Sequence, residues 1–275
     1  MRDGGKREVE AISPLIGSIR LVAGSGCCRL WCMIHHRLLA VISPLFMPIA
    51  SAAPPLDSES LALFRVVEDK DGYVNARTGP SPTAKVDRRV SSGCAVAVSD
   101  AANGWFHLED ETGAGRPLFI HGSRLGAVGD WKQVPCVIST AKKTATVHSG
   151  GFKAVVTHVP FNAASHDIKL PPPGSNARLT IDGHRVIGTD GTLPDASLNL
   201  DVLLDGSPVA VPPDATRDLY QPNLARPEDL VLLTSGDPAK QALVFLWASD
   251  GAGGYFVIWS FLNGKYVGRA LFTSI

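Results

Sequence analysis

The sequence predicts an all-β fold, in which a small barrel and a larger sandwich-like β domain follow an N-terminal leader. Its 275 residues are enough for one large domain or two small ones. The 27 Gly and 20 Pro are scattered at intervals that suit tight turns between short strands. No stretch of residues 136–275 has a convincing apolar period of 3.6 residues, which argues against long amphipathic helices there.

The first 52 residues have the pattern of a leader rather than of a folded element. From Met33 the chain has a short basic start, the apolar run Leu38–Ile49 and then small residues, with an A-x-A pattern that ends at Ala52. We expect a signal peptide at residues 33–52, translation from Met33 and cleavage after Ala52. The apolar run is shorter than the roughly 20 residues that cross a bilayer, so we expect no membrane span after cleavage. The mature chain is then periplasmic or secreted.

Removing the leader leaves 20 basic and 23 acidic side chains and no patch rich in Lys and Arg. Nucleic acid is therefore not an expected partner. The two remaining cysteines are Cys94 and Cys136. An oxidising compartment permits a disulfide between them, which would close a loop of about 40 residues and add about 4 kcal/mol of stability. The alternative of two buried thiols stays open, because the sequence does not give their geometry.

Residues 61–128 are predicted to form the first domain, a small closed barrel or sandwich of about five short strands. Phe64–Val67 is an apolar strand, Asp71-Gly72 is a turn, and Tyr73 begins a second strand. Residues 78–82 must form a loop, because proline cannot donate to a sheet. Further strand-like runs lie at 93–98, 105–108, 118–121 and 123–125, with turns at 103–104 and 112–115.

Four strings in this region carry a family pattern. D-G-Y-V-N-A-R-T-G-P-S begins at Asp71, G-C-A-V-A-V at Gly93, N-G-W-F-H-L at Asn103 and F-I-H-G-S-R-L at Phe119. In this order and spacing they resemble the bacterial SH3 domain family, over residues 61–128. One departure is Leu118, which stands where the family commonly has Gly. The turn at 109–117 is also longer than typical, so we expect a reshaped groove beside it.

The resemblance implies an SH3-like barrel that binds a ligand, of the kind attached to cell-wall hydrolases and envelope proteins. The implied partner is peptidoglycan or an envelope protein or peptide. Aromatic rings flanked by a few polar groups suit such recognition. In the alternative interpretation, the polar candidates only fix a turn through hydrogen bonds to the backbone, and the tryptophan belongs to the core. The ligand-binding candidates are Tyr73, Asn75, Arg77, Trp105 and His121.

Residues 136–275 are predicted to form a second all-β domain, sandwich-like and of no recognised family, joined to the first by the polar stretch 126–135. Residues 242–248 have the pattern of a buried strand and 255–262 of a strand rich in aromatics, which turns at Asn263-Gly264 into a third strand at 265–272. Asp-Gly turns at 182–183, 190–191 and 205–206 separate shorter runs. These runs lie at 136–138, 144–147, 154–159, 179–181, 198–204, 209–211 and 231–233.

We predict no catalytic centre, no cofactor and no metal site. The six His after the leader include no H-x-H or H-E-x-x-H pair, and no G-x-S-x-G string occurs. Cys94 falls in the middle of a predicted strand, a poor position for a nucleophile. The chain is therefore interpreted as a non-catalytic envelope protein that binds peptidoglycan or an envelope protein. Two alternatives stay open, a periplasmic inhibitor or immunity protein acting on a wall-degrading enzyme, and an enzyme of unfamiliar type with its site in the C-terminal domain.

Overall fold

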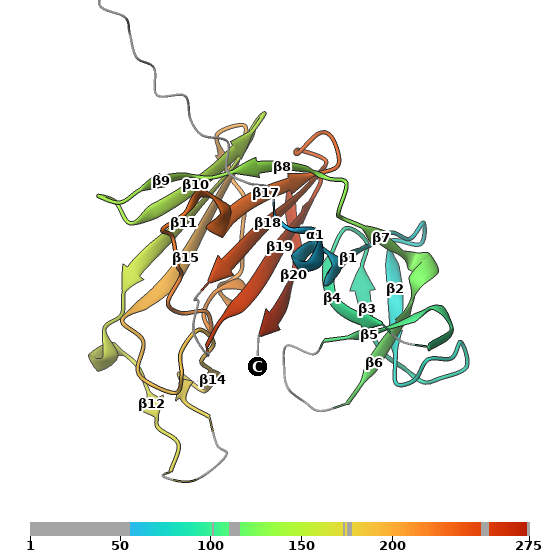
Figure 1. Ribbon diagram of the computed structural model, residues 1–275, viewed down its shortest axis with the longest axis horizontal. Helices are drawn as coiled ribbons and strands as arrows, with labels where there is room; N and C mark the ends of the chain where they lie inside the picture. Colours follow the sequence, from blue (N-terminus) through green and yellow to red (C-terminus); the bar gives the residue numbers. More distant parts are fainter. Residues whose placement is uncertain are drawn as a thin grey trace, which may run out of the picture. The chain divides into compact units, whose positions relative to one another are not determined.

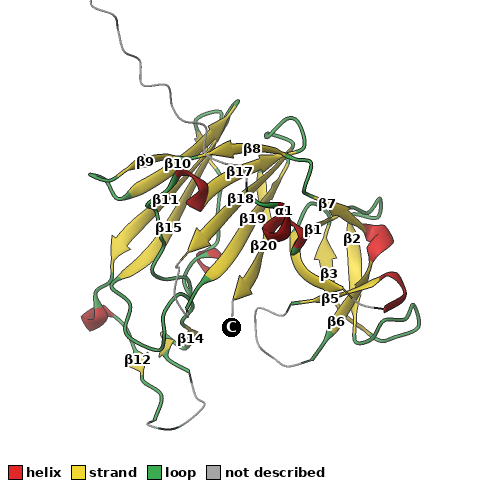
Figure 2. Ribbon diagram, in the orientation of Figure 1, coloured by secondary structure: helices red, strands yellow, loops and turns green. Residues whose placement is uncertain are grey.

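The computed structural model describes residues 56–100, 102–109, 116–172, 174, 178–248 and 253–273. The leader, its cleavage position after Ala52 and the predicted turn at 112–115 lie outside the described residues. In the described part, antiparallel strands dominate beside one short α-helix, α1 (Ser58–Ala62), and single turns of 3-10 helix (Figures 1 and 2). No helix in this part is long and apolar enough to cross a membrane. The predicted all-β fold is confirmed.

The first sheet has seven antiparallel strands in the order β3-β2-β6-β5-β4-β1-β7. Its core contains alternate side chains of β2, Val74 and Ala76, together with Val98, Leu108 and Ile120 from three other strands. Strand β3 was not predicted, because its sequence V-D-R-R-V-S lies at the sheet edge with nearly every side chain exposed, so no alternation marks it. The strands are β1 (Phe64–Val67), β2 (Tyr73–Arg77), β3 (Val86–Ser91), β4 (Ala95–Asp100), β5 (Trp105–Leu108), β6 (Leu118–His121) and β7 (Leu125–Ala127).

The remaining strands form two five-stranded sheets, β16-β15-β11-β10-β9 and β20-β19-β18-β17-β8, and a small sheet β12-β13-β14. The polar stretch that was predicted as a linker contributes a strand, β8, to the second of these sheets. The strand predicted at 209–211 is wrong, because pairing ends at Pro208. The strands are β8 (Lys132–Pro135), β9 (Val137–Ser139), β10 (Thr144–Ser149), β11 (Phe152–Pro160), β12 (Ile168–Lys169), β13 (Thr180–Ile181), β14 (His184–Arg185), β15 (Ala196–Leu204), β16 (Ser207–Pro208), β17 (Leu230–Thr234), β18 (Gln241–Ala248), β19 (Tyr255–Leu262) and β20 (Lys265–Thr273).

The two five-stranded sheets pack face to face around a shared apolar core. Phe152 of β11 contacts Phe261 of β19, with ring centroids 5.3 Å apart, and both are almost fully buried. Trp259, at the centre, is fully buried, and its indole N–H donates to the carbonyl of Ala215 at 2.8 Å. The sandwich expected from the sequence is therefore present.

The other face of the β17–β20 sheet is covered by the seven-stranded sheet of the first domain, which is the predicted barrel. Phe64 of β1 packs edge-on against Phe245 of β18, with centroids 6.0 Å apart, within one buried cluster that also contains Ile258. Strands β4 and β20 lie side by side (Figure 1). Burial on both faces explains why 242–248 is a continuous apolar run rather than an alternating one.

Three predicted Asx-Gly turns connect hairpins in the way that their sequences favour. The paired φ angles are 52° and 79° at Asp182-Gly183, 49° and 79° at Asp205-Gly206, and 49° and 70° at Asn263-Gly264. Two successive positive φ values define the type I′ turn, whose twist matches that of the flanking strands. These turns fix the β13–β14, β15–β16 and β19–β20 hairpins.

No disulfide joins Cys94 and Cys136, each of which is a buried cysteine. Cys94 precedes β4, and its sulfur lies against Gly268 of β20. Cys136 follows β8, and its N–H donates to the carbonyl of Pro227 at 3.2 Å. Strands β20 and β8 are opposite edges of one sheet, so four strand spacings, about 19 Å, separate the two positions, whereas a disulfide tolerates about 7 Å between Cα atoms. Of the two alternatives that the sequence left open, the structure therefore has two buried thiols and not the disulfide.

Candidate functional site

Three of the five candidate residues lie on the same face of β2. Burial alternates along this strand, so Val74 and Ala76 point into the barrel core while Tyr73, Asn75 and Arg77 point outward and remain partly exposed. A strand places residues i, i+2 and i+4 on one face. The string Y-V-N-A-R therefore presents a phenol, a carboxamide and a guanidinium in a row.

The other two candidates stand opposite each other on neighbouring strands. Trp105 of β5 pairs with His121 of β6, and their rings meet edge to face with centroids 5.2 Å apart and an interplanar angle of 81°. Strand β6 lies between β2 and β5 in the sheet. This strand order brings all five candidates together.

The five candidates line one groove of about 400 Å³. This volume lies within the range of pockets that hold small ligands or short peptide segments. Four further polar residues that the sequence did not single out as ligand-binding line the same groove: Asp69, Asp71, Ser123 and Arg124.

Arg77 and Asn75 differ in what they do for the fold. One amino group of Arg77 donates to the carbonyl of Ala84 at 2.7 Å, which ties β2 to the far end of the 78–85 loop. Arg77 thus helps to fix the turn, through one side-chain to backbone hydrogen bond. The Asn75 carboxamide has no hydrogen-bond partner among the described residues and is partly exposed. Its donor and acceptor groups are therefore not used within the described part of the fold.

The two aromatic candidates contribute differently to the groove. Trp105 is only 8% exposed, so it belongs largely to the core, as the alternative interpretation held. Tyr73 is partly exposed, and the guanidinium of Arg89 lies over its ring, 4.2 Å from the centroid. Trp105 thus offers the groove a narrow apolar surface, and Tyr73 offers a ring edge and a hydroxyl.

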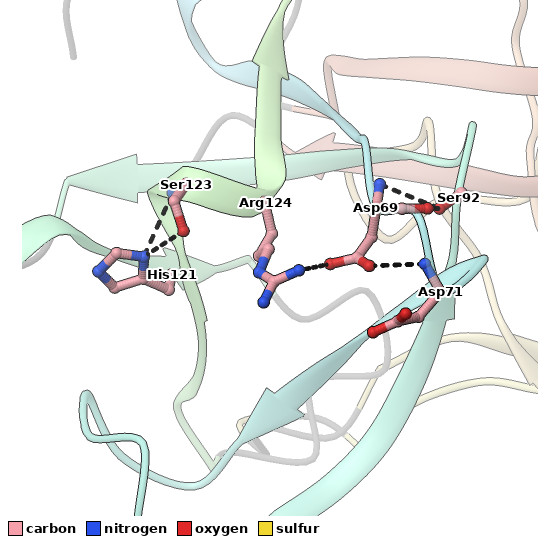
Figure 3. Close-up of polar contacts among 6 residues, drawn as sticks. All are labelled: Asp69, Asp71, Ser92, His121, Ser123 and Arg124. Carbon is pink, nitrogen blue, oxygen red and sulfur yellow. Dashed lines mark hydrogen bonds and ion pairs between the residues drawn. The ribbon is translucent and has the colours of Figure 1, made fainter.

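His121 holds a defined orientation at the start of a 3-10 turn. Its Nδ1 accepts from the Ser123 backbone N–H at 3.3 Å and lies 2.8 Å from the Ser123 hydroxyl. The ring turns toward Ser123 and away from the neighbouring Asp69–Arg124 pair (Figure 3). With Nδ1 acting as an acceptor, the proton of the neutral ring resides on Nε2, which becomes a donor.

Asp69 organises one end of the groove. Its side chain is only 3% exposed and forms an ion pair with Arg124. It also accepts from the Asp71 backbone N–H at 2.9 Å, while the Ser92 hydroxyl donates to its backbone carbonyl at 2.9 Å (Figure 3). The N–H of Asp71 and then the guanidinium of Arg124 hold the pKa of the Asp69 carboxyl below its ordinary value of 3.8.

The sequence contained partial signals for these additional residues. The spacing D-x-D-G at 69–72 is typical of an Asx-turn, in which the first carboxylate accepts from the backbone two residues later. Arg124 belongs to one of the family-like strings. What the sequence did not reveal is their pairing, because the two residues are 55 positions apart.

A second cavity, of about 320 Å³, lies between β3, β4 and β20. Arg88, Glu109 and Arg269 are among its lining residues. Arg269 forms a bidentate ion pair with Asp218, with each N···O distance 2.6 Å. None of the five candidates lines this cavity, so it is separate from the groove.

Comparison with known families gives one match. Residues 70–115 match the family described as bacterial SH3 domain, which agrees with the resemblance over 61–128. The matched segment contains Tyr73, Asn75, Arg77 and Trp105 but ends before His121. Neither a curated protein nor a solved structure matches the chain. This likeness suggests a binding module, and the matched segment contains four of the five candidates that line the groove.

Proposed function

We propose that the chain is an exported envelope protein that holds peptidoglycan, or a peptide segment of an envelope protein, in the groove of its SH3-like barrel. The observation that carries this proposal is the convergence of all five candidates on one groove. The likeness of residues 70–115 to bacterial SH3 domains supports a binding role. The signal-peptide pattern at residues 33–52 supports export.

The chemistry of the groove suits reversible recognition. Trp105 contributes apolar surface, while Tyr73, Asn75 and His121 offer a hydroxyl, a carboxamide and an imidazole N–H. Polar groups at fixed positions in a groove set the orientation of a ligand. His121 and Arg77 are held by hydrogen bonds within the protein, so little side-chain freedom is lost when a ligand binds.

Co-sedimentation of the purified chain with insoluble, protein-free peptidoglycan tests the proposal. We expect the wild-type chain to sediment with the wall material, and Tyr73→Ala to bind about tenfold more weakly because it removes the aromatic contact. A suitable control is Leu170→Ala, which truncates a side chain that is 63% exposed outside the groove. If the wild type stays in the supernatant, or if Tyr73→Ala and Leu170→Ala sediment equally well, peptidoglycan is not the ligand of this groove.

A further inference from the structure

The charged groups of the groove are separated along β2. Asp71 lies just before the strand and Arg77 at its end, so the acidic and basic groups occupy opposite ends of the row that begins at Tyr73. The two remaining charges, on Asp69 and Arg124, pair with each other. The groove therefore has an acidic end and a basic end rather than a uniform charge.

The acidic end has a carboxylate that the fold does not use. Asp71 is exposed, and its carboxylate has no ion-pair or hydrogen-bond partner among the described residues. Its backbone N–H donates to the Asp69 side chain at 2.9 Å. This hydrogen bond fixes the position of the residue, while its carboxylate stays unpaired among the described residues. In Figure 3 the only contact drawn for Asp71 joins its backbone N–H to Asp69, and none is drawn from its carboxylate.

The basic end has a guanidinium that is anchored but not neutralised. Arg77 donates one N–H to the Ala84 carbonyl, and no carboxylate pairs with it among the described residues. A guanidinium has five N–H donors and binds a carboxylate with two of them at once. The carbonyl of Ala84 thus orients Arg77 while leaving donors for an anionic group.

The spacing of these ends fits a short extended peptide. From Tyr73 to Arg77 the strand rises about 13 Å at roughly 3.3 Å per residue, and Asp71 extends the row to at most about 20 Å. An extended ligand of four to six residues spans the same distance. Between the ends, Asn75 offers both a donor and an acceptor, which matches the alternating N–H and C=O groups of a peptide backbone.

We propose that the groove binds an extended peptide of four to six residues in one direction, with its carboxylate at Arg77 and its ammonium group at Asp71. This inference rests on the proposed function, because it names the ligand class of the same groove. A glycan strand has no ammonium group for Asp71, so this carboxylate would lose hydration without gaining a partner. The two ends therefore favour peptide over glycan.

Titration of the full chain, followed by NMR chemical shifts, tests the direction of binding. The probes are penta-alanine with free ends, its N-acetylated form, its C-amidated form and the doubly capped peptide. Amidation removes the carboxylate of the peptide, so it should weaken binding about fivefold in the wild type but not in Arg77→Gln. Acetylation removes the ammonium group, so it should weaken binding about fivefold in the wild type but not in Asp71→Asn. Arg77→Lys keeps the charge and should keep the sensitivity to amidation. Arg88→Gln, on the exposed strand β3, is the matched control and should keep both sensitivities.

The outcomes separate this inference from the function on which it rests. Equal binding of the doubly capped and free-ended peptides in the groove overturns the charge-directed orientation and leaves the binding function intact. If amidation weakens binding to Arg77→Gln as much as binding to the wild type, the peptide carboxylate does not lie at Arg77, and this also overturns it. If peptide-free glycan strands bind in the groove and the peptides do not, the ligand is a glycan and the inference is wrong. If neither peptides nor wall material bind, the proposed function itself is wrong.

Discussion

The backbone N–H of Ala95 in β4 donates to the side-chain hydroxyl of Ser260 in β19 at 2.8 Å, across 165 positions of sequence. Both residues are fully buried, and they lie where the barrel covers the outer face of the β17–β20 sheet. Together with the Phe64–Phe245 contact, this bond makes the barrel part of a larger core. We therefore expect the barrel and the sandwich to unfold together.

Ser260→Ala tests this coupling. The substitution leaves the Ala95 N–H buried without an acceptor, which should lower the free energy of unfolding by about 1–3 kcal/mol. Ser207→Ala, at an exposed position of β16, should change it by less than about 0.5 kcal/mol. Urea unfolding followed by tryptophan fluorescence and far-UV circular dichroism measures both effects. Two separate transitions in the wild-type chain would contradict the shared core.

The two cysteines give a second prediction. Burial raises the pKa of the Cys136 thiol to about 11, so at pH 8 the reactive thiolate is scarce, and Cys94 is also buried. In chain purified without reductant, iodoacetamide should label neither position in the native state and both after unfolding, as measured by peptide mass spectrometry. Absence of label on both cysteines after unfolding would indicate the disulfide that the structure lacks.

The pH dependence of stability gives a third prediction. The pKa of Asp69 is held low in the folded state, first by the Asp71 N–H and then by Arg124. Its stabilising contribution is therefore present above its ordinary pKa of 3.8 and is lost as the pH falls through the lowered value. Asp69→Asn should be less stable than the wild type at pH 7, and the difference should shrink below about pH 4. Denaturant unfolding at several pH values measures it. A difference that does not change with pH would show that the carboxylate charge has no role.

The side chains that share one face of a single strand could be predicted from the sequence, because buried and exposed residues alternate along neighbouring positions. The string Y-V-N-A-R identified β2, and the family-like strings placed Trp105 and His121 in the same domain. Asx-Gly pairs identified three hairpins for the same reason, since the turn chemistry lies in two adjacent residues. These local signals were sufficient for the five candidates of the groove.

Relationships between distant segments could not be predicted. The apolar runs of β18 and β19 indicate burial on both faces, but they do not indicate that β1 and β4 cover one of them. The ion pair between Asp69 and Arg124 has no sequence pattern, because it depends on the pairing of β1 with β7, which lie far apart in the sequence. Likewise, the distance between Cys94 and Cys136 depends on the order of strands β20 to β8 in one sheet. The sequence around either cysteine does not indicate this order.

Asn75 provides the most direct test of the central claim, since its carboxamide has no hydrogen-bond partner among the described residues. We predict that Asn75→Ala leaves the melting temperature unchanged and weakens binding of solubilised peptidoglycan fragments, measured by isothermal titration calorimetry, by about threefold to tenfold. Asn199→Ala, at an exposed position of β15, should bind like the wild type. Equal affinity of Asn75→Ala and the wild type, at equal stability, would contradict a ligand site in this groove.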